Sequence, residues 1–319
     1  MSSSAPMLQD GRAGQTSGLS AGESADGAGT RHGRHLVILL CSLLAVAGWL
    51  YLAAVLASMV PVMDMSEAGP GMGLFNAFNI FDGLPKDVRA ALAVLCLPAG
   101  ATTFGMPSEQ WGAGGAALVF FMWMMMTLAM MLPSAMPVFL AHAKRRAHAV
   151  SGPSAAATVS LLALGYLTIW TAYALAATLV QWLLTGYGLL SSMMAPVSLV
   201  FSATTLIAAG LYQFTPAKQA CLLRCWYPRW SSPATGGSAV SFYREGLVQG
   251  LACLGCCWAL MTVMFAVGIM NIIWVGLLGA VMALEKNLPS RWFYKATGVF
   301  LLLWGLSLMG ATLILSGKI

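Results

Sequence analysis

Apolar stretches long enough to cross a lipid bilayer recur along this chain from residue 36 to the C-terminus. A helix needs about 20 residues to cross a hydrocarbon core about 30 Å thick. Only 8% of the 319 residues are charged, whereas an ordinary soluble domain has roughly 25%. A soluble fold could not cover its surface with so few charges. The sequence therefore predicts an all-α, polytopic transmembrane helical bundle.

Seven apolar segments are predicted to be the transmembrane helices. They cover residues 36–60, 112–141, 155–184, 193–214, 246–267, 270–284 and 296–315. With seven helices, every cluster of basic residues between them lies on one side of the membrane. Because such clusters mark the cytoplasmic side, we expect a cytoplasmic N-terminus. Orientation also explains the net charge of +6, so we expect the bilayer as a partner and no nucleic acid.

Residues 1–30 are rich in Ser, Gly and Ala and lack aromatic residues. Such a composition buries too little apolar surface to offset the entropy of ordering, so we predict a disordered tail. A signal peptide is the alternative, because basic residues precede the apolar run at 36–60. That run is long for a signal peptide and begins late. We therefore expect an uncleaved helix and a transmembrane domain over residues 36–315.

Residues 61–111 form a loop that we expect on the extracytoplasmic side. Acidic residues outnumber basic ones there, and Gly and Pro are frequent. Within the loop, residues 88–103 are apolar but are interrupted by Pro98 and Gly100. This favours an interfacial or re-entrant segment, and an eighth span is the alternative.

Five of the seven cysteines fall in two groups, one just after the fourth predicted helix and one early in the fifth. The groups are Cys221 with Cys225, and Cys253 with Cys256 and Cys257. Both groups are expected near the cytoplasmic surface, and spacings of three and four place each group on one helix face. Thiolates select soft ions such as Cu(I) and Zn(II), and a reducing cytoplasm favours metal binding over disulfides. Buried cysteines that act only as small apolar side chains are the alternative.

The second predicted helix adds thioethers, which are also soft ligands for copper. We predict Met130, Met131 and Met136 as accessory ligands, and apolar packing is the alternative role of these side chains. Glu285, at the end of the sixth helix, is a candidate partner of the metal site, because ionisable groups at the rim of a membrane bundle are functional candidates. The alternative is a solvated charge paired with its neighbour Lys286.

The sequence gives little support for histidine ligands or for the motifs of ATPases and hydrolases. His142 and His148 flank the basic residues that follow the second helix, and we expect both to be solvated rather than ligating. No phosphate-binding loop, no Gly-x-Ser-x-Gly turn and no His-Glu-x-x-His pair occurs. We therefore expect neither ATP hydrolysis nor a hydrolase.

Several motifs between residues 110 and 310 occur together in order. They read MMLPS at 130–134, GLYQFTPAK at 210–218, CLLRC at 221–225 and GLACLGCCWALM at 250–261, followed by Met270-Asn271 and Glu285-Lys286. In these motifs the chain resembles a bacterial family of predicted metal-binding integral membrane proteins, a domain of unknown function. The resemblance implies a metal site and names neither the metal nor a reaction.

Our leading hypothesis is a membrane protein that binds a soft transition metal, copper first and zinc second. It would transport or deliver this metal rather than act as an enzyme, with a metal donor or acceptor protein as its partner. One alternative is a membrane thiol-disulfide oxidoreductase in which two cysteines cycle between dithiol and disulfide. Another is a structural or assembly subunit in which Gly246, Gly250 and Gly255 allow close contact with partner helices.

Overall fold

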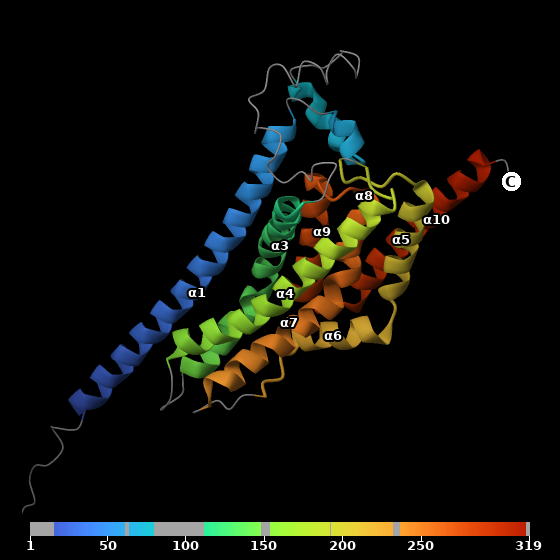
Figure 1. The fold of residues 1–319 in the computed structure, drawn as a ribbon. Coiled ribbons are helices and arrows are strands. Elements are labelled where there is room, and N and C mark those ends of the chain that lie inside the picture. The colour runs from blue at the N-terminus through green and yellow to red at the C-terminus, as the bar shows by residue number, and fades with distance from the viewer. Residues whose placement is uncertain are drawn as a thin grey trace, which may run out of the picture.

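A computed structural model describes residues 16–60, 64–79, 112–147, 154–191, 193–231 and 237–316. Within these ranges the chain consists of helices and the turns that connect them (Figure 1). The helices are α1 (Thr16–Met59), η1 (Met65–Ala68), η2 (Met72–Phe78), α3 (Ala113–Ala147), α4 (Ala155–Gly186), α5 (Leu199–Tyr212), α6 (Pro216–Trp226), α7 (Ala239–Thr262), α8 (Met264–Val267), α9 (Ile272–Asn287) and α10 (Arg291–Leu315).

Five stretches of the described chain are long and apolar enough to cross a membrane. They are His35–Met59, Ala113–Arg146, Ala155–Gly186, Ala239–Val267 and Arg291–Leu315. The all-helical class and the multi-span character expected from the sequence agree with this. Helices α5 and α9 have 14 and 16 residues, fewer than the about 20 that a full span needs. A total of seven spans therefore stays a prediction.

Two boundaries near the middle of the chain differ from the prediction. Helix α5 begins at Leu199 rather than near residue 193, because the Ser198 hydroxyl accepts a hydrogen bond from the Phe201 amide and caps the helix there. Residues 216–226, expected as a loop, form helix α6. Thr215 caps it by accepting from the Lys218 amide at 3.3 Å, and Pro216 suits its first turn.

The N-terminal region also differs in part. Helix α1 begins at Thr16, inside the segment 1–30 that we predicted to be disordered. Once the apolar span has nucleated a helix, extending it toward the N-terminus costs little per residue. In the predicted loop 61–111, residues 64–79 carry η1 and η2, and the segment 88–103 lies outside the described residues.

The long helices run alternately up and down the bundle (Figure 1). Helix α1 packs along α3, α4 packs against α3 and α7, and α5 packs against α10. The end of α3 and the starts of α4 and α7 lie together at one end, while α8 and the start of α9 lie toward the other. Helix α6 crosses the bundle between these ends. This arrangement brings the end of α3 close to the start of α7, where the guanidinium group of Arg146 lies over the ring of Phe242. The orientation in the membrane stays a prediction.

Helices α4 and α7 pack closely against each other through glycine residues. Gly165 on α4 and Gly246 on α7 face each other, and a side chain at either position would overlap the backbone of the other helix. Gly250 contacts Ile169 of α4, and Gly255 contacts Cys221 of α6. These glycines therefore contact helices of their own chain, which removes the basis for assigning them to partner proteins.

Candidate metal site

Helix α7 carries three of the predicted cysteine ligands on its buried face. Cys253, Cys256 and Cys257 are 4%, 1% and 1% exposed. Their spacing of three and four residues places them on one side of the helix. Residues of α4, α6 and α9 contact them on that side. The thiols are therefore enclosed by helices rather than directed toward lipid.

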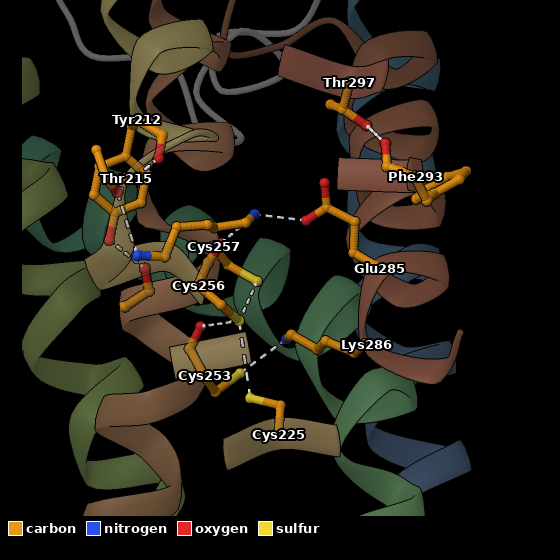
Figure 2. Close-up of polar contacts among 12 residues, drawn as sticks. Tyr212, Thr215, Cys225, Cys253, Cys256, Cys257, Glu285, Lys286, Phe293 and Thr297 are labelled. Atoms are coloured by element: carbon orange, nitrogen blue, oxygen red, sulfur yellow. Dashed lines mark hydrogen bonds and ion pairs between the residues drawn. The ribbon is translucent and has the colours of Figure 1, made fainter. Parts of the chain in front are cut away.

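Helix α6 brings a fourth thiol to this group. The Sγ of Cys225 lies 3.9 Å from the Sγ of Cys256, and the Sγ of Cys256 lies 3.4 Å from that of Cys257 (Figure 2). Cys256 also contacts the carbonyl oxygen of Cys253 at 3.1 Å. We call Cys225, Cys253, Cys256 and Cys257 the thiol cluster.

The sulfur separations show which thiols are placed to share an ion. A metal–sulfur bond of about 2.3 Å puts two sulfurs on one ion about 3.8 to 4.6 Å apart, for bond angles from tetrahedral to linear. The 3.9 Å between Cys225 and Cys256 falls in this range. In the part of the chain that the structure describes, no group of three or more His, Cys, Asp or Glu side chains is placed to hold a metal ion. The arrangement is therefore a two-sulfur pair with further thiols beside it.

A buried lysine lies at the edge of the thiol cluster. The Nζ of Lys286 on α9 is 2.8 Å from the Sγ of Cys253, 2.9 Å from the Ser134 hydroxyl and 3.5 Å from the Sδ of Met131. The Tyr166 hydroxyl lies 2.9 Å from the same Cys253 sulfur. Lys286 therefore places a positive charge directly against the thiols.

A second buried lysine, Lys218 on α6, contacts residues of both α7 and α9. The Nζ of Lys218 lies 2.6 Å from Glu285 Oε2 and 2.6 Å from the carbonyl oxygen of Cys256. Trp226 donates a hydrogen bond to the Glu285 carbonyl at 2.8 Å. The alternative that Glu285 pairs with Lys286 is wrong, because neighbouring residues on a helix point about 100° apart. Glu285 points to Lys218, and Lys286 points to Cys253.

A cavity of about 40 Å³ opens beside the thiol cluster. Such a volume holds water or a single ion. The Nε2 of Gln249, which lines the cavity, has no hydrogen-bond partner within the described residues. The polar and sulfur-containing side chains that line this cavity include Ser134, Tyr166, Cys225, Gln249, Cys253 and Lys286. The thiols thus border a small cavity whose lining combines these side chains with apolar ones such as Val138 and Phe139.

Comparison with known proteins identifies the family of this chain. Residues 120–308 match the family model PpoB2, which is described as a copper chaperone. The match covers more than half of the chain. This chain belongs to that copper chaperone family. No functionally curated protein and no solved structure matches the chain.

Membership in the copper chaperone family confirms the expected resemblance to a metal-binding family and adds copper to it. The matched residues include every residue that we predicted for the metal site. The match also lies within residues 110–310, which carry the motifs of that resemblance.

Cys221, one turn before Cys225 on α6, is the predicted ligand that stands apart. Its sulfur packs against Gly255 on α7. Within the described residues, no hydrogen bond joins it to the thiol cluster. Burial raises the pKa of the Cys221 thiol above its ordinary value, which favours the protonated form over the thiolate that binds metals.

The three predicted methionines occupy different surroundings on α3. Met131 is fully buried beside Lys286. Met130 is also buried, but its side chain packs against Gly279 of α9. Met136 is half-buried against the apolar core. Of the three, Met131 has a contact that joins it to the thiol cluster, through Lys286.

His142 is fully buried, so the expectation that it is solvated is wrong. Its ring lies 5.1 Å from the ring of Trp230 and 5.8 Å from that of Phe242, measured between centroids. Neither ring nitrogen has a hydrogen-bond partner among the described residues. The basic neighbours suggested solvent, but Trp230 and Phe242, far along the sequence, cover the imidazole. His148 lies outside the described residues.

Sequence reasoning missed Lys218, Lys286, Ser134 and Tyr166 as parts of the site. The two lysines were interpreted as orientation signals, as basic residues between spans usually are. The rule that ionisable groups at a bundle rim are functional candidates was applied to Glu285, and it applies equally to Lys286 beside it. For Ser134 and Tyr166, hydropathy carries no signal that separates a site residue from a packed one.

Proposed function

We propose that this protein holds a Cu(I) ion in transit at the thiol cluster and passes it to another protein. The observation that carries the proposal is the 3.9 Å separation of the Cys225 and Cys256 sulfurs, which come from two different helices. Family membership supports copper as the cargo. Thiolates are the ligands that select Cu(I).

The ligand count favours copper over zinc. Structural zinc sites almost always have four ligands in tetrahedral geometry. The described residues offer a sulfur pair, with no group of three or more His, Cys, Asp or Glu side chains placed to share an ion. Two soft sulfurs satisfy Cu(I) but leave Zn(II) short of ligands. Zinc therefore stays the second candidate.

The remaining predicted site residues take supporting roles in this proposal. Met131 supplies a neutral thioether beside the thiols, and Cys253 and Cys257 offer alternative sulfurs within the thiol cluster. Cys221 lies on the same face of α6 as Cys225 and serves as a neighbouring thiol in transfer. Glu285 acts through Lys218, which holds the Cys256 carbonyl. Met130 and Met136 offer further soft donors along α3, outside the set of ligands that fixes copper affinity at the thiol cluster.

Transfer to a partner begins at α6. Cys225 is partly exposed, whereas Cys256 is buried. A soft donor on a second protein therefore reaches Cys225 first and replaces Cys256 by ligand exchange. The positive-inside pattern supports a cytoplasmic position for α6 in a bacterial inner membrane, with the partner a cytoplasmic metal donor or acceptor.

Copper content tests the proposal. The detergent-purified protein is loaded anaerobically with Cu(I), and bound copper is measured by mass spectrometry. We expect near-stoichiometric copper in the wild-type protein and in the Cys41→Ser control, since Cys41 is a buried cysteine of α1. The double variant Cys225→Ser/Cys256→Ser should lose more affinity than the about 10- to 100-fold that outer-shell changes cost. Unchanged copper in a folded double variant would contradict the proposal.

Redox cycling is the second candidate function, because the same two sulfurs are also close enough for a disulfide after a modest approach. Bond formation needs an S–S distance of about 2.05 Å. Two thiols would then become a disulfide while a quinone takes up two electrons and two protons. Loss of alkylatable thiols on quinone treatment, abolished by Cys225→Ser alone, would support this function. A thiol content that quinone leaves unchanged would exclude it.

A further inference from the structure

The two buried lysines beside the thiol cluster differ in what balances their charge. Lys218 pairs with Glu285 at 2.6 Å, and both side chains are at most 1% exposed. This pair contributes no net charge. Lys286 contacts Cys253, Ser134 and Met131. Among the described residues, no carboxylate lies within ion-pair distance of Lys286.

The difference in charge balance between the two lysines matters because both side chains are buried. Lys286 is 8% exposed. A buried ammonium group is costly unless a negative charge lies close to it. The groups that can provide that charge are the thiols themselves, once they are deprotonated to bind a metal. Lys286 therefore sets the net charge that the metal complex should have.

The charge balance depends on the valence of the ion. Two thiols that bind a monovalent cation release two protons and leave a complex of charge −1, which cancels the charge of Lys286. The same two thiolates with a divalent cation are neutral and leave Lys286 uncompensated. This count holds for any two thiols of the cluster while the others stay protonated.

A divalent ion could restore the balance by recruiting a third thiolate. The described part of the chain does not offer that arrangement, because no group of three or more His, Cys, Asp or Glu side chains is placed to share an ion. The two-sulfur geometry and the positive charge of Lys286 thus both favour a monovalent ion over a divalent one.

We propose that Lys286 makes the thiol cluster selective for monovalent soft cations, Cu(I) and Ag(I), over divalent soft cations such as Cd(II). This inference rests on the proposed function, because it takes the Cys225–Cys256 pair as the metal site. Lys286 is a specificity-determining residue in this scheme and not itself a ligand. Its charge lies at the edge of the thiol cluster, where Nζ is 2.8 Å from the Cys253 sulfur, and the low dielectric of the interior extends its effect to the neighbouring Cys225–Cys256 pair.

Competition between Ag(I) and Cd(II) tests the inference. Both ions prefer thiolates, and neither changes oxidation state during the measurement. The full-length protein in detergent is titrated anaerobically with each ion alone and with both together, and bound metal is measured by mass spectrometry. We expect the wild-type protein to prefer Ag(I). Lys286→Met should lower the Ag(I)/Cd(II) affinity ratio by roughly 10- to 100-fold, whereas Lys286→Arg should largely preserve it.

A lysine outside the thiol cluster provides the control. Lys295→Met removes the charge of an exposed lysine of α10 and should leave the affinity ratio unchanged. Lys286→Gln gives a second neutral variant if Lys286→Met does not fold.

The outcomes separate this inference from the proposed function. If the wild-type protein binds neither Ag(I) nor Cu(I), the proposed function fails. If it binds them but prefers Cd(II), or if a folded neutral variant at Lys286 keeps the wild-type ratio, the inference about Lys286 is overturned while the proposed function stands.

Discussion

The two halves of the bundle differ in the charged groups that they bury. In the half that contains α6, the buried polar groups around the thiol cluster include two lysines and a glutamate. In the half that contains η1 and η2 they include amides. Gln181 accepts from Trp123 Nε1 at 2.8 Å and donates to Met194 Sδ at 3.0 Å. Asn271 donates to the Pro70 carbonyl at 2.9 Å.

Under the proposed function, this contrast separates the half that binds the ion from the half whose buried polar groups serve only the fold. The amides contact neutral partners in other segments, so their hydrogen bonds are satisfied by the protein itself. Lys286 has sulfur and hydroxyl partners and no carboxylate within the described residues, so a metal complex of negative charge completes its surroundings. We therefore expect changes in the amide half to alter stability alone, whereas changes beside the thiol cluster can alter copper binding as well as stability.

The largest effect on stability is expected within the α6 half, at the Lys218–Glu285 pair. Lys218→Met leaves a buried carboxylate unpaired, and breaking a buried pair in this way costs about 3–5 kcal/mol. Thermal unfolding in detergent should show a large fall in the melting temperature. The double variant Lys218→Met/Glu285→Gln should recover most of it. Equal melting temperatures for the single and double variants would show that the pair is not what holds α6 in place.

A smaller effect is expected in the amide half, at Asn271. Its side chain caps α9 by accepting from the Trp274 amide at 3.3 Å and reaches Pro70 as well. Asn271→Ala should lower the free energy of unfolding by about 1–3 kcal/mol with no change in copper affinity. Asn287→Ala is the control, because Asn287 is an exposed asparagine of the same helix. A lower copper affinity of the Asn271→Ala variant would contradict the proposal that the amide half contributes to stability alone.

The smallest effect is expected at the methionines of α3. Met131→Leu keeps the volume and removes a thioether beside Lys286, so we expect roughly a tenfold loss of Cu(I) affinity. Met130→Leu is matched in chemistry and burial but lies against Gly279, so it should bind copper like the wild-type protein. Competition with a Cu(I) chelator measures both variants. Equal affinities for the two would assign Met131 to packing alone.

Much of the fold was predictable from the sequence because hydropathy is a local property. Each predicted span has a helix in the structure, and α4 begins at the predicted residue 155. Helix α6 was missed because its 11 residues have a balanced composition with no apolar run. What makes these residues a helix is the Thr215 cap and the contact of Lys218 with α7 and α9.

The candidate site was predictable at the level of residue groups but not of pairs. Cysteine spacing and topology brought four of the five predicted thiols together correctly. The same reasoning could not show that Cys221 lies against Gly255 while Cys225 meets Cys256. Which cysteine of α6 meets which residue of α7 depends on how the two helices pack. The spacing of residues within either helix does not predict that packing.

The sequence by itself determined that this chain is an all-helical protein with several helices of membrane-spanning length, that its cysteines fall in two groups, and that its motifs resemble a metal-binding family. Only the tertiary structure decided that Glu285 pairs with Lys218, that Lys286 faces Cys253, and that His142 is buried. The physical reason is that a window of sequence reports how apolar a helix is and which residues share its face. The partner on that face is set by helix packing, which joins residues such as Ser134 and Lys286 that lie far apart in the chain.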